Sequence, residues 1–391
     1  MTLLAIAAWA IAAIPAVPLA VLTLELVSGL ASARPAKSPR QTATLAVLIP
    51  AHNEERGIAE TIIAVRAVAP PATRILVVAD NCSDDTASAA RDAGGETIER
   101  SDRSARGKGY ALAFGRDHLA RTKPPDCVIV LDADCRLTPG SLEALASTAL
   151  IRRTPAQAIN LVSADLTTDP LVQISSFAMM VKNVIRSRGM QRLGGAALLT
   201  GTGMAFPWPL FAQAHLATGS IVEDLALGVE MTRSGYPPSL VECARVTSAP
   251  AHPEDALAQR KRWEHGFLET LRRNALPTIA SGLLRRSRAE LALGLHLLVP
   301  PLALLIAMAM ITLPALAALG YLGAGPGPSL AVAVALVCAL ALVVACWFKG
   351  GRPYLSAGAS LRAPLYILWK IPIYMGFLRR RSAEWTRTPR R

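Results

Sequence analysis

The chain has 391 residues, of which 52% are hydrophobic, and its mean hydropathy of +0.36 is high for a soluble enzyme. Its formal net charge is +13, so a basic surface faces an acidic partner, for which anionic lipid, nucleic acid and a phosphorylated substrate are the candidates. Because much of the charge flanks apolar segments, we expect a membrane surface and no nucleic-acid partner.

The first segment is an apolar run, "LLAIAAWAIAAIPAVPLAVLTL" at residues 3–24. It lacks a basic leader and exceeds the roughly 7–15 residues of a secretory core, although Ala31-Ser32-Ala33 imitates a cleavage site. We therefore predict an uncleaved transmembrane helix over residues 1–30, since roughly 20 apolar residues cross a bilayer. The basic residues that follow it place the N-terminus outside. They are Arg34, Lys37 and Arg40.

The polar middle of the chain alternates apolar runs with segments of helical spacing. The expected strands are "TLAVLIP" (44–50), "RILVVAD" (74–80) and "CVIVLDAD" (127–134), and the expected helices are 55–68, 84–94 and 108–120. This alternation predicts an α/β domain over residues 43–255 with a mostly parallel central sheet covered on both faces. Ligands of such sheets bind beyond the carboxyl ends of the strands, so residues just after each strand are candidate site residues.

Polar side chains end each predicted strand. They are His52, Asn53 and Glu54 after the first, Asp80 and Asn81 after the second, and Asp132 and Asp134 after the third. No G-x-x-x-x-G-K-[ST] loop is present, and no G-x-G-x-x-G follows the first strand, which excludes the familiar phosphate-binding loops. Glu54 and Asp80 are suited to accept hydrogen bonds from a base and a ribose hydroxyl.

Asp132 and Asp134, in "LDADC", place two like charges at one edge of the sheet. Two acids after a strand often form only a solvated turn. Beside Glu54 and Asp80, however, they indicate a site for Mg²⁺ or Mn²⁺, which takes oxygen ligands and bridges substrate phosphates. Such an ion makes a diphosphate a better leaving group. Lys108, in "ARGKG", can add positive charge near the same phosphates.

Two further polar motifs follow. Glu223 and Asp224 begin an amphipathic helix, where acids stabilise the helix dipole, but Asp224 can also act as a general base for an acceptor hydroxyl. The segment 256–290 contains "AQRKRWEHGF". One interpretation of this segment is a basic interfacial helix without a role in binding. Alternatively, Trp263 stacks on a sugar ring while Arg262 binds phosphate.

The C-terminal part is mostly apolar. Residues 291–348 contain no Asp, Glu, Lys or Arg, and a Gly/Pro-rich stretch divides them into predicted transmembrane helices at 291–319 and 329–348. Residues 361–391 carry Arg362 and Lys370 and end in a basic tail, which favours an amphipathic helix lying on anionic headgroups. These flanks predict a multi-pass protein of the cell (inner) membrane whose catalytic domain is cytoplasmic.

Seven motifs, in this order, resemble those of the membrane-integrated glycosyltransferases of family 2, inverting enzymes related to cellulose, chitin and hyaluronan synthases. The motifs are "IPAHNEE", "VVADNCSDDT", "RGKGYAL", "LDADC", "GTGMAF", "VEDLALG" and "QRKRW". Each is modest alone, but their order over residues 44–267 is highly specific. The flanking spans and the basic tail are also similar in arrangement.

The resemblance implies a GT-A fold, a nucleotide-diphosphate sugar donor (usually a UDP-sugar) and Mg²⁺ or Mn²⁺. It also implies a role for each matching position. Ala51, His52 and Glu54 would line the nucleotide site, with Asp80 on the base and Lys108 nearby; Asp132 and Asp134 would be the D-x-D pair, Asp134 being the direct metal ligand; Asp224, after Glu223 in the E-D motif, would be the base; and Gln259, Arg262 and Trp263 would be the Q-x-x-R-W set beside diphosphate and acceptor.

The motifs leave the acceptor open. Val222 stands where many relatives have Thr, and so few spans hardly enclose a secretion channel. Transfer to a membrane-held lipid and polymer synthesis with partner subunits for export are both compatible with the motifs. So are a nucleotidyl- or sugar-phosphate transferase and a non-catalytic subunit that binds nucleotide sugar for a polysaccharide synthase.

Overall fold

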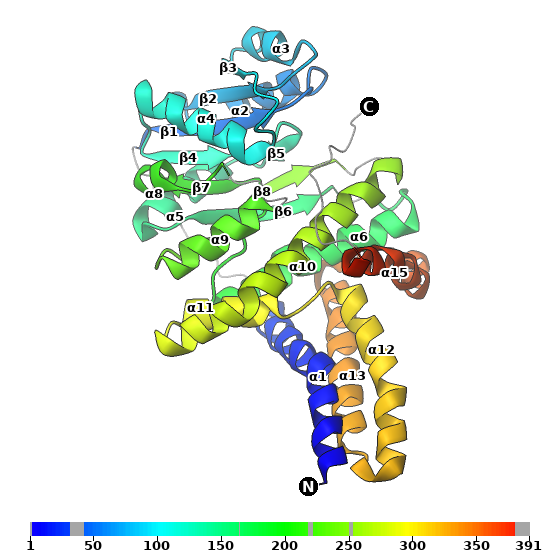
Figure 1. Cartoon of the computed structure of the whole chain (residues 1–391). Coiled ribbons are helices and arrows are strands. Elements are labelled where there is room, and N and C mark those ends of the chain that lie inside the picture. The colour runs from blue at the N-terminus through cyan, green and yellow to red at the C-terminus, as the bar shows by residue number, and fades with distance from the viewer. Residues whose placement is uncertain (1, 32–42, 164, 218–221, 250–252, 380–391) are drawn as a thin grey trace. The chain divides into compact units, whose positions relative to one another are not determined.

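A computed structural model describes residues 2–31, 43–163, 165–217, 222–249 and 253–379 (Figure 1). Within this part, the side chains of 253–260 and 378–379 are not described. The chain divides into two units, one comprising residues 33–163 and 196–251, the other 1–32, 164–195 and 252–391.

The first unit is built on an eight-stranded sheet in the described residues, with strand order β3-β2-β1-β4-β7-β6-β8-β5. The strands are β1 Leu45–Ala51, β2 Arg74–Asp80, β3 Glu96–Arg100, β4 Cys127–Val130, β5 Cys135–Leu137, β6 Ala156–Val162, β7 Met204–Pro207 and β8 Ser239–Ser248. Neighbours from β3 to β4 pair in parallel, as do β6 and β8. β7 is antiparallel to both of its neighbours, and β5 is antiparallel to β8. The predicted mostly parallel sheet is thus confirmed, with antiparallel insertions that the motifs did not indicate.

Helices cover both faces of this sheet because successive side chains of a strand point to opposite sides. The helices are α2 Ile58–Val68, α3 Thr86–Asp92, α4 Lys108–Arg121, α5 Ser141–Arg152, α8 Trp208–Gln213 and α9 Glu223–Arg233. Val47 and Ile49 of β1 pack in one core with residues of α2 and α5. Leu48, between them, joins a second core formed with α4, α8 and α9. The two cores hold the carboxyl ends of β1, β2 and β4 at one edge.

The second unit is helical. Its elements are α1 Leu3–Leu30, α6 Pro170–Met180, η1 Val181–Arg186, α7 Ser187–Arg192, α10 Pro253–Leu284, α11 Arg288–Leu297, α12 Leu302–Leu319, η2 Gly320–Ala324, α13 Gly327–Cys346, η3 Trp347–Gly351, α14 Ala357–Ser360 and α15 Ala363–Arg379. Among the described residues, three helices are long and apolar enough to cross a membrane, at Leu3–Leu30, Leu302–Ala324 and Gly327–Gly351. This agrees with one N-terminal and two C-terminal spans.

The second of these helices begins later than the charge-free stretch does. The sequence predicts a span from residue 291, whereas α11 ends at Leu297 and the candidate span begins at Leu302. Pro300 and Pro301 lie between the two helices, and a proline disfavours helical backbone in the residue before it. Absence of charge therefore did not mark the start of the helix.

A buried polar cluster fastens α1 within this unit. Arg186 Nε donates to Glu25 Oε2 and His296 Nδ1 donates to Glu25 Oε1, each at 2.7 Å. All three side chains are buried. A carboxylate in an apolar helix is costly unless it is paired, and here both of its oxygens are used.

Candidate active site

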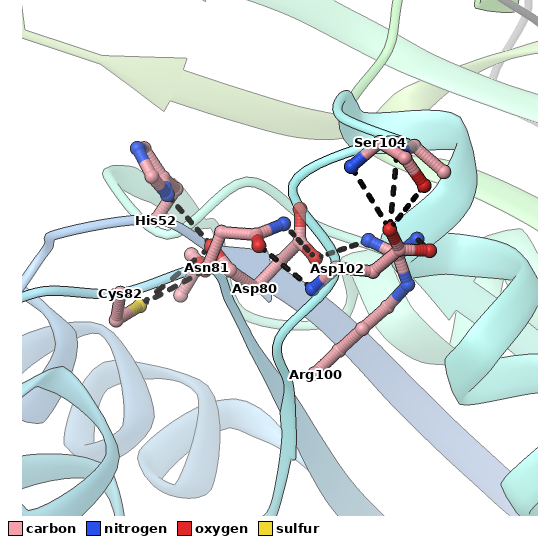
Figure 2. Close-up of polar contacts among 9 residues, drawn as sticks. His52, Asp80, Asn81, Cys82, Arg100, Asp102 and Ser104 are labelled. Atoms are coloured by element: carbon pink, nitrogen blue, oxygen red, sulfur yellow. Dashed lines mark hydrogen bonds and ion pairs between the residues drawn. The ribbon is translucent and has the colours of Figure 1, made fainter.

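The loops after β1 and β2 are joined by polar contacts at the carboxyl edge of the sheet (Figure 2). His52 Nδ1 donates to the backbone carbonyl oxygen of Asp80 at 2.6 Å, and this hydrogen bond fixes the orientation of the His52 ring. Asn53 and Asn81 adopt left-handed backbone, with φ of 55° and 52°, a region that Asn tolerates better than most residues. Asn53 exchanges hydrogen bonds with Ser83 through both ends of its amide. The residues that follow β1 and β2 therefore form one hydrogen-bonded surface, which is called the wall below.

Asp80 is anchored in this wall by Arg100. The Asp80 side chain is 9% exposed, and its Oδ1 accepts from Arg100 Nη1 at 2.7 Å and from Asn81 Nδ2 at 3.0 Å. Arg100 also pairs with Asp102 at 3.1 Å, and Asp102 caps the backbone of Ser104 at 3.0 Å (Figure 2). The carboxylate is thus fixed in orientation at the edge where ligands of parallel sheets bind.

Lys108 brings together segments that are distant in the sequence. Its ammonium, at the start of α4, donates to Asp132 Oδ1 and, at 2.6 Å, to the carbonyl oxygen of Gly201. A Cβ placed on Gly201 would lie 3.2 Å from Asp224 Oδ2 and 3.3 Å from Lys108 Nζ. The E-D motif of α9, the acid after β4 and the lysine of α4 consequently share one site.

The charges in this site shift one another. Burial alone would lower the pKa of Lys108, but the carboxylates of Asp132, Glu223 and Asp224 outweigh burial and hold that pKa above its usual value. Burial, together with the adjacent Asp224 carboxylate, raises the pKa of Glu223 to about 7. Lys108 therefore stays a cation, while Glu223 titrates near neutral pH.

Asp132 and Asp134 are placed to hold an oxygen-preferring cation. Each offers a ligand atom, as does Cys135, and the three atoms lie within 4.8 Å of one another. Burial raises the pKa of the Cys135 thiol far above its usual value, so the thiol keeps its proton and donates to Asp134 Oδ1 at 3.6 Å. The donor set that remains is two carboxylates, which suits Mg²⁺ or Mn²⁺.

A cavity of about 10 Å³ borders the charged cluster. Polar groups of Lys108, Glu223 and Asp224 meet there with apolar side chains of Leu112, Met204 and Leu216.

The remaining predicted residues occupy two places. The backbone N–H of Glu54 donates to Thr86 Oγ1 at 2.7 Å, and the Ala51 carbonyl accepts from Cys82 Sγ at 3.6 Å. Both therefore belong to the wall between β1 and β2. Gln259, Arg262 and Trp263 lie on α10 of the other unit, where Trp263 is 41% exposed, Arg262 is half-buried and the Gln259 side chain falls outside the described residues.

Sequence reasoning did not find two residues of the site, Arg100 and Thr86, or the contact that Gly201 makes. Arg100 sits in β3, a strand that was not predicted, so no strand-end pattern pointed to it. Thr86 supports Glu54 from α3. Gly201 was visible in "GTGMAF", but its contact with Lys108 depends on a pairing across 93 positions of sequence.

Similarity to known proteins identifies the family of the chain. Residues 40–266 match the family model described as "Glycosyltransferase like family 2". No curated protein matches the chain significantly.

Solved structures are similar as well. The mannosyltransferase PcManGT from Pyrobaculum calidifontis, in complex with GDP-Man and Mn²⁺, has a TM-score of 0.58 at 17% identity, covering 94% of this chain and 100% of that one. Glucosyl-3-phosphoglycerate synthase from Mycobacterium tuberculosis, in complex with Mn²⁺, UDP and phosphoglyceric acid, has a TM-score of 0.40 at 21% identity, covering 58% of this chain and 78% of that one. The first similarity shows a shared GT-A fold; the second is too weak to add to it.

Proposed function

The chain belongs to glycosyltransferase family 2, and on that premise we propose that it moves a sugar, with inversion, from a nucleotide-diphosphate sugar to a lipid-linked or saccharide acceptor at the cytoplasmic face of the membrane. The observation that carries the proposal is the ammonium of Lys108, which binds Asp132 and Gly201 beside the Asp224 carboxylate. A group for the diphosphate and a candidate base are thereby next to each other.

The donor would lie along the carboxyl edge of the sheet. Ala51, His52, Glu54 and Asp80 would line its nucleoside, because their loops form one ordered wall there. Asp134, with Asp132, would hold Mg²⁺ or Mn²⁺, which neutralises a bound diphosphate. Mn²⁺ accompanies GDP-Man in the similar mannosyltransferase, which supports a divalent ion and leaves the base and sugar of this chain's donor open.

The transfer itself would be a single displacement. Asp224 accepts the proton of an acceptor hydroxyl, whose oxygen attacks the anomeric carbon opposite the diphosphate. Lys108 stabilises the negative charge that the leaving diphosphate gains. Glu223, with its pKa of about 7, holds a proton part of the time and so reduces the charge beside Asp224.

The helical unit would supply the acceptor side. Gln259, Arg262 and Trp263 are proposed to contact the diphosphate and acceptor, since Arg262 can bind phosphate and Trp263 can stack on a sugar. The candidate spans would seat the enzyme in the inner membrane with its N-terminus outside. Export of a polymer would require partner subunits.

Replacing the base tests the proposal. In Asp224→Asn we expect transfer to fall by about 10²-fold to 10⁴-fold, because the base is lost, while the nucleotide sugar still binds. The assay is nucleoside diphosphate release, with donor affinity measured by calorimetry. Glu230→Gln is the matched control, because Glu230 lies on the same helix and is 42% exposed. Near-normal turnover of Asp224→Asn would show that the base is another group.

A further inference from the structure

Helix α10 exposes Trp263 and buries the residue two positions later. Trp263 is 41% exposed, whereas His265 is 9% exposed. A helix turns about 100° per residue, so the direction of each side chain fixes the directions of its neighbours. The contacts of Glu264 and His265 therefore also set the direction of Trp263. Glu264 and His265 are both held by α15.

Two polar contacts fasten α15 to α10. Lys370 forms an ion pair with Glu264, and their side chains are 8% and 13% exposed. His265 Nε2 donates to the carbonyl oxygen of Ile373 at 2.8 Å, and its ring packs edge-on against Phe377 at 5.6 Å. The Lys370 ammonium also lies 4.7 Å from the centre of the Tyr366 ring. Contacts from three turns of α15 thus converge on the two residues after Trp263.

The opposite face of α15 is apolar and exposed. Its exposed side chains recur at helical spacing and include Leu365, Leu368 and Met375. The sequence predicted an interfacial helix here, partly because Lys370 interrupts the apolar run; in the structure the Lys370 side chain is buried in an ion pair with Glu264. The exposed face suits a helix half-sunk in lipid headgroups.

An ion pair is an expensive way to join these helices. Removing both charges from water costs more than packing apolar side chains of similar size. Leu268, Ile373 and Tyr374 already form an apolar contact between the helices. The ion pair therefore contributes more to the alignment of α10 with α15 than to the free energy that holds the two helices together.

We propose that Lys370 is a positioning residue whose ion pair with Glu264 fixes the rotation of α10, and with it the directions of Arg262 and Trp263, against the membrane-facing helix α15. This inference rests on the proposed sugar transfer, in which Arg262 and Trp263 act on the diphosphate and acceptor. Lys370 itself touches neither substrate.

The test compares Lys370→Met, Lys370→Arg, Glu264→Gln and the double variant Glu264→Gln/Lys370→Met. The control is Arg362→Met, which removes an exposed cation just before the same helix. Turnover is divided by the concentration of nucleotide-binding sites, so that a smaller amount of folded protein does not lower the measured kcat. We expect Lys370→Met to lower kcat by about tenfold with donor affinity unchanged, as small misplacements of binding groups do. Lys370→Arg should keep most of the activity, and the double variant should lose no more than Lys370→Met alone.

A second readout does not depend on catalysis. Quenching of Trp263 fluorescence, taken as the difference from the same variant carrying Trp263→Phe, should change in Lys370→Met and stay constant in Arg362→Met. Unchanged quenching in Lys370→Met, or unchanged kcat, would overturn the positioning role. Absence of sugar transfer in the unaltered protein, with quenching changed as expected, would instead contradict the proposed function.

Discussion

Two adjacent acids, Glu223 and Asp224, illustrate how burial assigns different roles to similar groups. Glu223 is pushed toward its protonated form by burial and by its neighbour, whereas Asp224 lies near Gly201 and the Lys108 ammonium. A single cation cannot compensate several carboxylates in a buried site. Glu223 therefore titrates near neutral pH, whereas Asp224 is the proposed base.

This leads to a prediction on the pH dependence of stability. The pKa of Glu223 rises from 4.5 to about 7 on folding, so between these values the folded chain holds a proton that the unfolded chain has released. Rising pH then favours unfolding, by up to about 3 kcal/mol. Thermal unfolding in detergent from pH 5 to 8 should show a falling Tm, and Glu223→Gln should flatten the fall. Parallel curves for the two proteins would contradict the shift.

Among the elements, the loop before β7 can lie directly against Lys108 and Asp224 because Gly201 has no side chain. Gly201 has φ of +84°, and an added Cβ would press on both side chains. Gly140 offers a matched control, since its φ is +80° and nothing lies within 4 Å of its added Cβ. We expect Gly201→Ala and Gly140→Ala to cost similar stability, about 1 kcal/mol. Only Gly201→Ala should lose turnover, by about tenfold or more; equal turnover in both variants would contradict the crowding argument.

Sequence patterns predicted the buried elements better than the edges. β1, β2 and the helices that cover them follow apolar spacing closely. β3 was missed because "ETIER" is an edge strand with charged, partly exposed side chains. The third strand was predicted to residue 134, but β4 ends at Val130. Beyond it, the Asp132 carboxylate accepts from Lys108, and the backbone N–H of Asp132 donates to Thr202 Oγ1.

The site follows the same division. Carboxylates at strand ends could be predicted, since parallel strands bring their carboxyl ends to one edge. Their partners could not, because the contacts of Arg100 and Gly201 arise from pairing between segments that are distant in the sequence. The roles of Gln259, Arg262 and Trp263 stay predictions.

For the whole molecule, we predict an orientation in the membrane that places the unit containing the sheet in the cytoplasm. Cys243 on β8 is an exposed free thiol in the unit that we expect to be cytoplasmic. A membrane-impermeant maleimide should label it in inverted inner-membrane vesicles and fail to do so in intact spheroplasts. Cys243→Ser identifies the signal, because the labelling it removes belongs to that thiol. Labelling of Cys243 from outside the cell would reverse the proposed topology.

The proposed sugar transfer requires that the acids after β4 and at the start of α9 form a single metal-dependent site. The direct measurement is product release by the detergent-solubilised protein over a panel of nucleotide-diphosphate sugars with lipid and saccharide acceptors. We predict release of nucleoside diphosphate that EDTA stops and Mn²⁺ or Mg²⁺ restores in the unaltered protein, but not in Asp134→Ala. Release of pyrophosphate or nucleoside monophosphate, or release that persists in excess EDTA, would contradict the claim.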